Sequence, residues 1–258
     1  MKYLNDISYK DCVGKVCKSK SSGDFKILKY NDRANVEIQF INTGFETTVQ
    51  LVQVKSGSVK DPYSPSIYGV GIIGTKYPVS EGGSDTKDYS LWKSMLQRCY
   101  SNILKKRCPT YIGCEVSDKF KSYEYFYEWC HRQVGFGNKG WQLDKDLLSK
   151  ECKIYSEHTC VFVPPEINGF LLNGNSYRGD LPLGVILDKG AKKPRYRARL
   201  SKYGKYYCYG SYSNPTDAFY AYKQAKEDFA KELAEKWKAQ IDPRVYNALM
   251  NYQVEITD

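Results

Sequence analysis

The sequence has few of the residues on which several classes of protein depend. It contains two histidines and no Cys-X-X-Cys pair, which disfavours a zinc ribbon. No apolar run approaches the roughly 18 residues that a membrane-spanning helix needs, and the opening MKYLNDISYKDC is too polar for a signal peptide. The nine cysteines form an odd set, which argues against a disulfide framework. We therefore expect a soluble intracellular protein with buried reduced thiols and no membrane partner.

Acidic residues are also in short supply. The chain of 258 residues has 39 Lys and Arg against 29 Asp and Glu, a formal charge of +10. Residues 181–212 hold eight basic residues and one acid, Asp188, and thus carry most of this excess. A local excess of positive charge is typical of a surface that binds a polyanion. The hydrophobic content of 41% is that of an ordinary globular protein.

The first half of the chain predicts a small β module followed by helices. Alternating apolar residues indicate strands at 25–30, 36–41 and 47–54. Residues 61–89 are rich in Pro, Gly and Ser and indicate a connector. Two helices are expected within 90–134, with Leu91, Met95 and Cys99 on one apolar stripe and Tyr123, Phe126 and Cys130 on the other.

The second half of the chain predicts strands and one long helix. Residues 141–172 are strand-like around a turn, and further strands are expected at 183–187, 195–200 and 206–211. The helix begins after Asn214, a good N-cap, with Pro215 in its first turn and Asp217 near the positive end of the dipole.

The strand predicted at 195–200 carries arginine at every second position. Successive side chains of a strand point to opposite faces, so Arg195, Arg197 and Arg199 share one face. The other face carries Tyr196, Ala198 and Leu200, which can then pack on the helix. Guanidinium groups bind phosphates and guanine edges in a bidentate manner, which favours a nucleic-acid surface over a merely solvated sheet face.

Residues 184–225 resemble an AP2/ERF DNA-binding domain. The matching features are Gly184-Val185, the basic strand, Gly210 and Ala221-Tyr222, whereas Tyr206 and Tyr207 stand where that family has a tryptophan-bearing strand. The resemblance implies a three-stranded sheet that enters the major groove and is backed by the helix. The DNA-binding residues that we expect are Lys192, Lys193, Arg195, Arg197, Arg199, Lys202, Lys205 and Tyr207.

Residues 91–168 resemble phage HNH or homing endonucleases. The matching segments are LWKSMLQRCY, PTYIGCEVS, FYEWC, LDKDLL and TCVFVPPEIN. The resemblance implies a ββα unit that binds one divalent metal on the scissile phosphate. An Asp-His pair of that family falls on Asp144-Lys145, so the general-base histidine is absent from its expected place.

Two alternatives follow for this central segment. In the first, Asp144, Asp146 and Asn168 bind Mg²⁺ or another divalent metal, and His158 or Lys145 transfers the proton. Strand alternation would point the two aspartates to the same face. In the second, the segment keeps the scaffold without catalysis and the metal is not needed.

The prediction is an α+β protein in three modules: a small β module at 1–75, a degenerate HNH-like core at 76–178, and an AP2-like sheet with a helix at 179–258. We expect a sequence-specific binder of double-stranded DNA in the cytoplasm of a phage-infected bacterial host, with metal-dependent endonuclease activity. A homodimer stays open. The rivals are a non-catalytic DNA binder, such as a repressor or interference factor, and an RNA-binding protein that stacks bases on its tyrosines.

Overall fold

The computed structural model describes residues 12–149, 152–171, 180–190, 193 and 195–256. Main-chain contacts divide the chain into two units, Met1–Trp129 and Cys130–Asp258, and both contain helices and several small sheets. The α+β class is therefore confirmed. The division lies within the predicted central module of 76–178, and the predicted boundary between 178 and 179 falls outside the described residues. In these described segments, no helix has the length and apolar character to cross a membrane.

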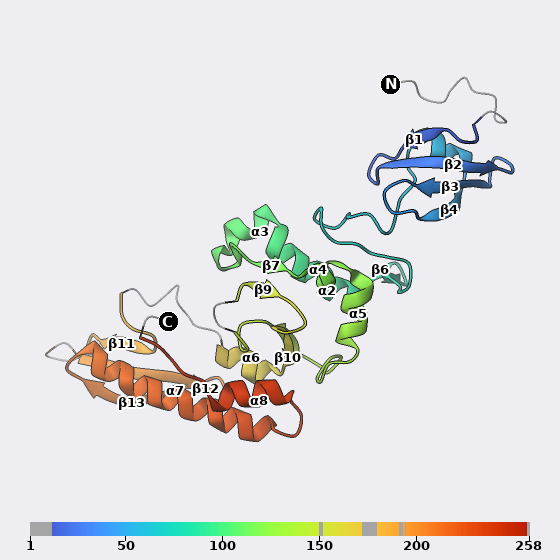
Figure 1. The fold of residues 1–258 in the computed structure, drawn as a ribbon. Helices are drawn as coiled ribbons and strands as arrows, with labels where there is room; N and C mark the ends of the chain where they lie inside the picture. Colours follow the sequence, from blue (N-terminus) through green and yellow to red (C-terminus); the bar gives the residue numbers. More distant parts are fainter. Residues whose placement is uncertain (1–11, 150–151, 172–179, 191–192, 194, 257–258) are drawn as a thin grey trace. The chain divides into compact units, whose positions relative to one another are not determined.

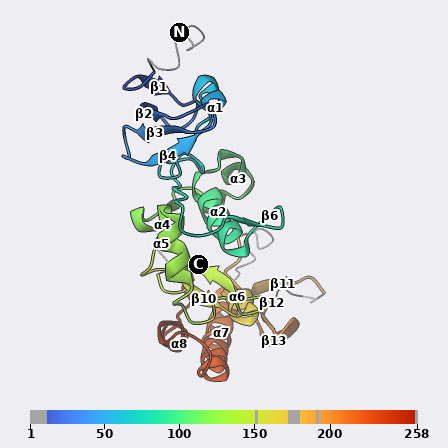
Figure 2. The ribbon, with the colours of Figure 1, turned by 90° about the vertical axis from the view of Figure 1, so that its right-hand side faces the viewer.

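The first unit opens with a four-stranded antiparallel sheet in chain order. Its strands are β1 (Val16–Lys18), β2 (Asp24–Tyr30), β3 (Val36–Phe40) and β4 (Glu46–Val49). Phe25, Ile27 and Ile38 are buried on one face, and Leu51 and Val54 of helix α1 (Leu51–Ser56) close that core. Figure 2 shows α1 beside the sheet. The strands predicted at 25–30 and 36–41 are thereby confirmed.

The strand predicted at 47–54 is wrong over its second half. Strand β4 ends at Val49, and the next turns are helix α1. The backbone N–H of Gln50 donates to Oε1 of Gln53 at 3.0 Å, which caps the helix at its start. Gly57 ends the helix with a φ of 64°, a left-handed conformation that glycine adopts at little cost. Alternating valines alone did not distinguish these two structures.

Helices with an aromatic core form the rest of the first unit. Trp92 and Met95 of α2 are fully buried together with Phe120 and Phe126, and the indole N–H of Trp92 donates to the Phe120 carbonyl at 2.8 Å. Both predicted helices are confirmed. The elements are β5 (Ser80–Glu81), β6 (Ser84–Asp85), α2 (Lys87–Tyr100), α3 (Asn102–Arg107), the 3₁₀ helix η2 (Pro109–Tyr111), β7 (Glu115–Val116), α4 (Asp118–Lys121) and α5 (Tyr123–Cys130).

The second unit begins with two paired strands and a helix. Strand β8 (Gln142–Asp144) pairs in antiparallel fashion with β10 (Val161–Val163), after which α6 (Pro165–Leu171) follows; β9 (Ile154–Tyr155) lies between them in sequence. The strand-like character predicted up to residue 172 is therefore wrong beyond β10. Proline suits the first helical position because its φ is already helical and its missing N–H has no partner there.

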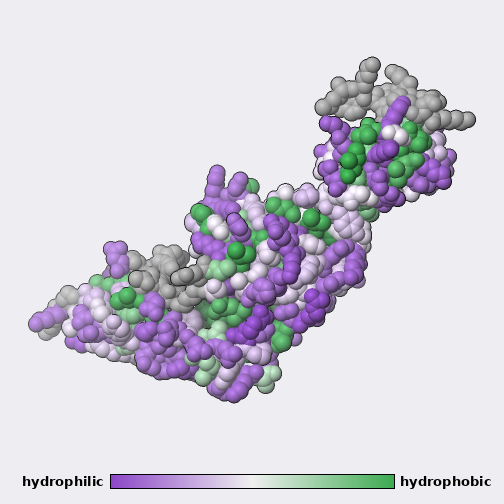
Figure 3. Space-filling view, viewed as in Figure 1, coloured by the Kyte–Doolittle hydropathy of each residue, from purple (hydrophilic) through white to green (hydrophobic). Residues whose placement is uncertain are grey.

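A three-stranded antiparallel sheet and a long helix complete the second unit. The sheet has the order β11 (Val185–Asp188), β12 (Arg195–Lys202), β13 (Lys205–Tyr212), and helix α7 (Pro215–Trp237) runs along β12 and β13 (Figure 1). The predicted cap is confirmed, since Oδ1 of Asn214 accepts from the backbone N–H of Asp217 at 2.8 Å. Helix α8 (Pro243–Met250) was not predicted. The side of α7 that faces the viewer in Figure 3 is largely hydrophilic.

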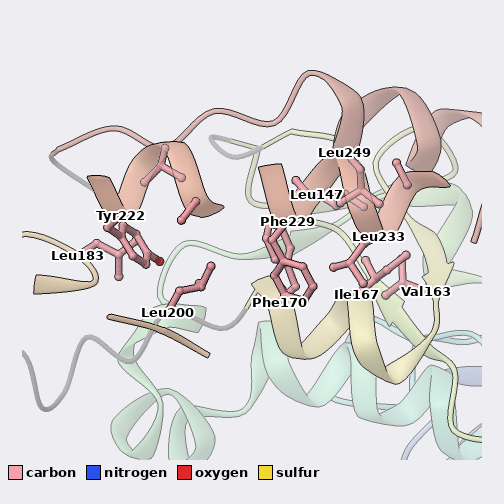
Figure 4. Packing of buried hydrophobic residues seen from close by; sticks show 14 of the residues in the cluster. Leu147, Val163, Ile167, Phe170, Leu183, Leu200, Tyr222, Phe229, Leu233 and Leu249 are labelled. Carbon is pink, nitrogen blue, oxygen red and sulfur yellow. The ribbon is translucent and has the colours of Figure 1, made fainter. Parts of the chain in front are cut away.

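One hydrophobic core joins residues of β10, α6, the three-stranded sheet, α7 and α8. Helix α7 packs Tyr222 against Leu183 and Leu200 near the sheet, and packs Phe229 against Phe170 of α6 (Figure 4). Leu233, further along α7, belongs to the same cluster as residues of β10, α6 and α8. The β8–β10–α6 segment and the three-stranded sheet thus share a core and do not have one each.

Lys226 lies inside this shared core. Its ammonium group donates to the Phe170 carbonyl at the end of α6 and lies 4.0 Å from the centroid of the Phe170 ring. Burial disfavours the charged form and lowers the pKa of Lys226 to about 8. The contact satisfies one of the carbonyl groups that the last turn of a helix leaves without an intrahelical partner.

Candidate functional site

The two faces of strand β12 differ as the sequence predicts. Arg195, Arg197 and Arg199 are exposed, whereas Ala198 and Leu200 are buried against α7. The alternation of a strand places the arginines on the side of the sheet that the helix does not cover.

The pairing of the strands identifies the neighbours of these arginines. Directly paired residues of antiparallel strands share a face. The surface that we call the arginine face therefore comprises Ile186, Asp188, Arg195, Arg197, Arg199, Ser201, Tyr206, Cys208 and Ser211. Cys208 lies opposite Arg199 in the register that starts at the hairpin turn, and a register shift between Arg199 and Arg197 then brings Ser211 opposite Arg197.

Each guanidinium group of the arginine face has a different partner on a neighbouring strand. Arg195 donates from Nε to Ser211 Oγ at 3.0 Å and from Nη2 to the Ser211 carbonyl at 2.7 Å. Nη2 of Arg197 forms an ion pair with Oδ2 of Asp188 at 2.5 Å. The guanidinium carbon of Arg199 lies 4.4 Å from the centroid of the Tyr206 ring. Three flexible side chains are thereby held in defined directions.

The remaining predicted DNA-binding residues are not all on this face. Nζ of Lys202 pairs with Oε2 of Glu232 on α7 at 3.0 Å, so its charge is turned to the helix side. Tyr207 pairs with Leu200 in the register and therefore belongs to the helix side too, although its side chain is exposed at the sheet margin. Lys205 pairs with Lys202 in the register and so starts β13 on the helix side, with its side chain exposed. Lys193 is exposed, and Lys192 lies outside the described residues.

The hairpin between β12 and β13 is held to α7 at its tip. Tyr203 and Gly204 form a two-residue turn with φ of 51° and 75°, the positive values that fit the twist of paired strands. The hydroxyl of Tyr203 donates to Oε1 of Glu232 at 3.0 Å. Together with Lys202, this contact fixes the tip of the hairpin to α7.

Sequence reasoning missed six residues of the arginine face as site residues: Ile186, Asp188, Ser201, Tyr206, Cys208 and Ser211. Ser201 follows Arg199 by alternation within β12, whereas the other five lie on neighbouring strands, where alternation within β12 could not find them. Their positions depend on the register and on its shift, and no local sequence pattern specifies either of these.

The predicted nuclease residues lie around the end of β8. Oδ1 of Asp144 accepts from the backbone N–H groups of Leu147 at 2.8 Å and Asp146 at 3.1 Å, so this carboxylate organises the turn after the strand. Burial is the largest influence on Asp144 and raises its pKa, against the two backbone hydrogen bonds, which lower it. Because β8 ends at Asp144, strand alternation does not extend to Asp146, and that part of the prediction is wrong.

Lys145 is buried beside these aspartates. Its ammonium group pairs with Oδ1 of Asp146, whose side chain is otherwise exposed, and lies 5.5 Å from the centroid of the Tyr155 ring. A divalent metal shared by Asp144 and Asp146 would have to displace this ammonium group. The donor set therefore fits a metal only after the side chain of Lys145 has moved.

His158 and Asn168 occupy different surroundings from the aspartates. The His158 side chain is 86% exposed, and its Nε2 is 3.9 Å from Oε1 of Glu157. Nδ2 of Asn168 donates to Oε1 of Gln142 at 3.0 Å, so α6 and β8 are joined at the first residue of the strand. Over the described ranges, His, Cys, Asp and Glu side chains form no group of three or more that could hold a metal ion.

Comparison with protein-family models, with curated protein sequences and with solved structures found no significant match to this chain.

Proposed function

We propose that the chain is a sequence-specific binder of double-stranded DNA and that the arginine face of the three-stranded sheet is its recognition surface. The observation that carries the proposal is the row of exposed arginines on β12, each held by a different partner. Side chains that are already oriented lose less conformational freedom when they bind, and defined donors favour base edges over diffuse contacts with phosphates.

The dimensions of a β sheet suit this ligand. The major groove of DNA admits a two-stranded β ribbon, and guanidinium forks match the N7 and O6 acceptors of guanine. Exposed Lys193 precedes β12, and exposed Lys205 is the first residue of β13, next to the hairpin turn. From these margins of the sheet their long side chains can contact phosphates and set its orientation.

The proposal predicts a steep loss of duplex affinity as salt concentration rises. If the arginine face and its flanking lysines contact about five phosphates, affinity for a random-sequence 30-base-pair duplex should fall roughly 10²- to 10³-fold between about 50 and 200 mM salt. Fluorescence anisotropy with a labelled duplex measures this dependence. A salt-independent affinity, or a preference for the corresponding single strand, would contradict the proposal.

A second candidate function is metal-dependent DNA cleavage. The observation that favours it is the order β8, β10, α6, with Asp144 at the end of the first strand and Asn168 on the helix. Bound Mg²⁺ would supply Lewis-acid stabilisation of the scissile phosphate. Asp144 and Asn168 would hold it, and displacement of Lys145 from Asp146 would be required first.

Incubation of supercoiled plasmid with the protein in Mg²⁺, Mn²⁺ or EDTA tests this second function. Nicks that need the metal and are lost in Asp144→Asn are the expected result for a nuclease. Asparagine keeps an oxygen that can accept from the turn and removes only the charge. Asp118→Asn serves as the comparison, because it makes the same change on an exposed carboxylate outside the candidate site. Tight binding without cleavage in any metal would leave a non-catalytic DNA binder, such as a repressor or interference factor.

A further inference from the structure

The acid of the arginine face is out of place on a surface that binds a polyanion. Asp188 is the one acidic residue among the basic residues of 181–212. It lies on β11 directly opposite Arg195, and its Oδ2 pairs with Nη2 of Arg197. An anion at this position opposes phosphate binding, so a surface that only needed affinity would be better without it.

The local contacts hold the Asp188 carboxylate in place. Its Oδ1 accepts from the backbone N–H of Gly190 at 3.1 Å, while Oδ2 faces Arg197. The aspartate side chain is largely buried at 18% exposure, whereas that of Arg197 is half exposed. Asp188 thus engages Nη2 of Arg197 and fixes the direction of this half-exposed side chain.

We propose that Asp188 is a specificity-determining residue and that Asp188 and Arg197 together read a G·C base pair in the major groove. This inference rests on the proposed function. Arg197 donates to guanine O6 and N7, and the adjacent carboxylate accepts from the N4 amino group of the paired cytosine. Donors and an acceptor side by side match the pattern that a G·C pair presents in that groove.

Asp188 also acts against wrong ligands. If adenine replaces the guanine and thymine the cytosine, one donor of Arg197 has no acceptor to contact. The thymine O4 acceptor then also lies near the carboxylate, where the cytosine has its amino donor. The carboxylate repels phosphates as well, so Arg197 is not drawn into sequence-independent contacts with the DNA backbone. Asp188 therefore lowers non-specific affinity while it raises discrimination between base pairs.

The experiment selects bound sequences from a random duplex library with the full chain, and compares wild type with Asp188→Asn. Wild type should enrich one position for G·C, and the variant should lose roughly 5- to 150-fold of that preference. Affinity for random duplex should meanwhile rise severalfold in the variant. Asp228→Asn is the matched control, because it makes the same change in charge on α7, where Asp228 accepts from Gln224.

A second variant covers the case in which Asp188→Asn does not fold. Arg197→Lys keeps the charge and removes the bidentate fork, so it should retain affinity for random duplex and lose the same G·C preference. An Asp188→Asn variant that folds and selects the same motif with the same discrimination as wild type overturns the inference while the proposed function stands. A wild-type protein that binds no duplex overturns the proposed function itself.

Discussion

Replacing Arg197 by alanine should weaken binding to the selected duplex by about 1–3 kcal/mol, or about 5- to 150-fold. Arg197 lies at the centre of the arginine face, between Arg195 and Arg199 on the same strand. The substitution removes its base contact and also leaves Asp188 without its ion-pair partner close to the DNA. An uncompensated carboxylate facing phosphates adds repulsion to the lost contact.

Two further variants separate these effects. The double variant Arg197→Ala with Asp188→Ala should recover part of the affinity for random duplex, because the repulsion is gone, but not the sequence preference. Lys231→Ala is the control for charge, since it removes one exposed positive charge from α7. Anisotropy titrations at one fixed salt concentration compare all four proteins. Wild-type affinity in a folded Arg197→Ala protein would remove the arginine face from the binding site.

Replacing Phe229 by alanine should destabilise the second unit by about 3–5 kcal/mol. The Phe229 side chain is buried, its ring meets that of Phe170 on α6 at a centroid distance of 5.6 Å, and it meets that of Tyr203 in the hairpin at 5.2 Å. Truncation removes the contacts of the Phe229 ring with Phe170 and with Tyr203 and leaves a cavity in its place. Loss of native structure should therefore occur in 141–171 and in 185–212 together.

Hydrogen exchange followed by segment, together with urea denaturation, measures this cooperativity. Tyr220→Ala is the matched control, because Tyr220 lies on the same helix with its side chain 60% exposed, and it should change stability little. If 141–171 kept its protection in Phe229→Ala while 185–212 lost it, the two segments would be independent modules. The shared core predicts the opposite result.

Local sequence patterns specify the parts of this protein that depend on neighbouring residues alone. The alternation of arginine with Tyr196, Ala198 and Leu200 sets the two faces of β12, because the side-chain period of a strand is two. The start of α7 follows from two residues. The side chain of Asn214 accepts from an N–H group of the first turn, and Pro215 has no N–H group that would need a partner there. The excess of positive charge in 181–212 is likewise a property of the sequence.

Tertiary structure decided the rest, because those features depend on residues far apart in the chain. Alternating valines fit a strand as well as the start of α1, and the packing of Leu51 and Val54 into the core of the four-stranded sheet is the contact with distant residues that distinguishes them. The pairing of β12 with β13 placed Tyr206, and not Tyr207, on the face of Arg199, and the register shift brought Ser211 opposite Arg197.

The same dependence on distant residues governs the charged side chains and the core. Alternation along β12 places Lys202 on the helix side, where Glu232 on α7 forms its ion pair. Asp188 became part of the arginine face because β11 pairs with β12. The three-stranded sheet and α6 share one core because α7 has apolar side chains on more than one side, so it packs on the sheet and on α6 at once. Spacing along the sequence determines which side chains share a face of a strand or helix. Only packing between elements determines which residues of other elements contact that face.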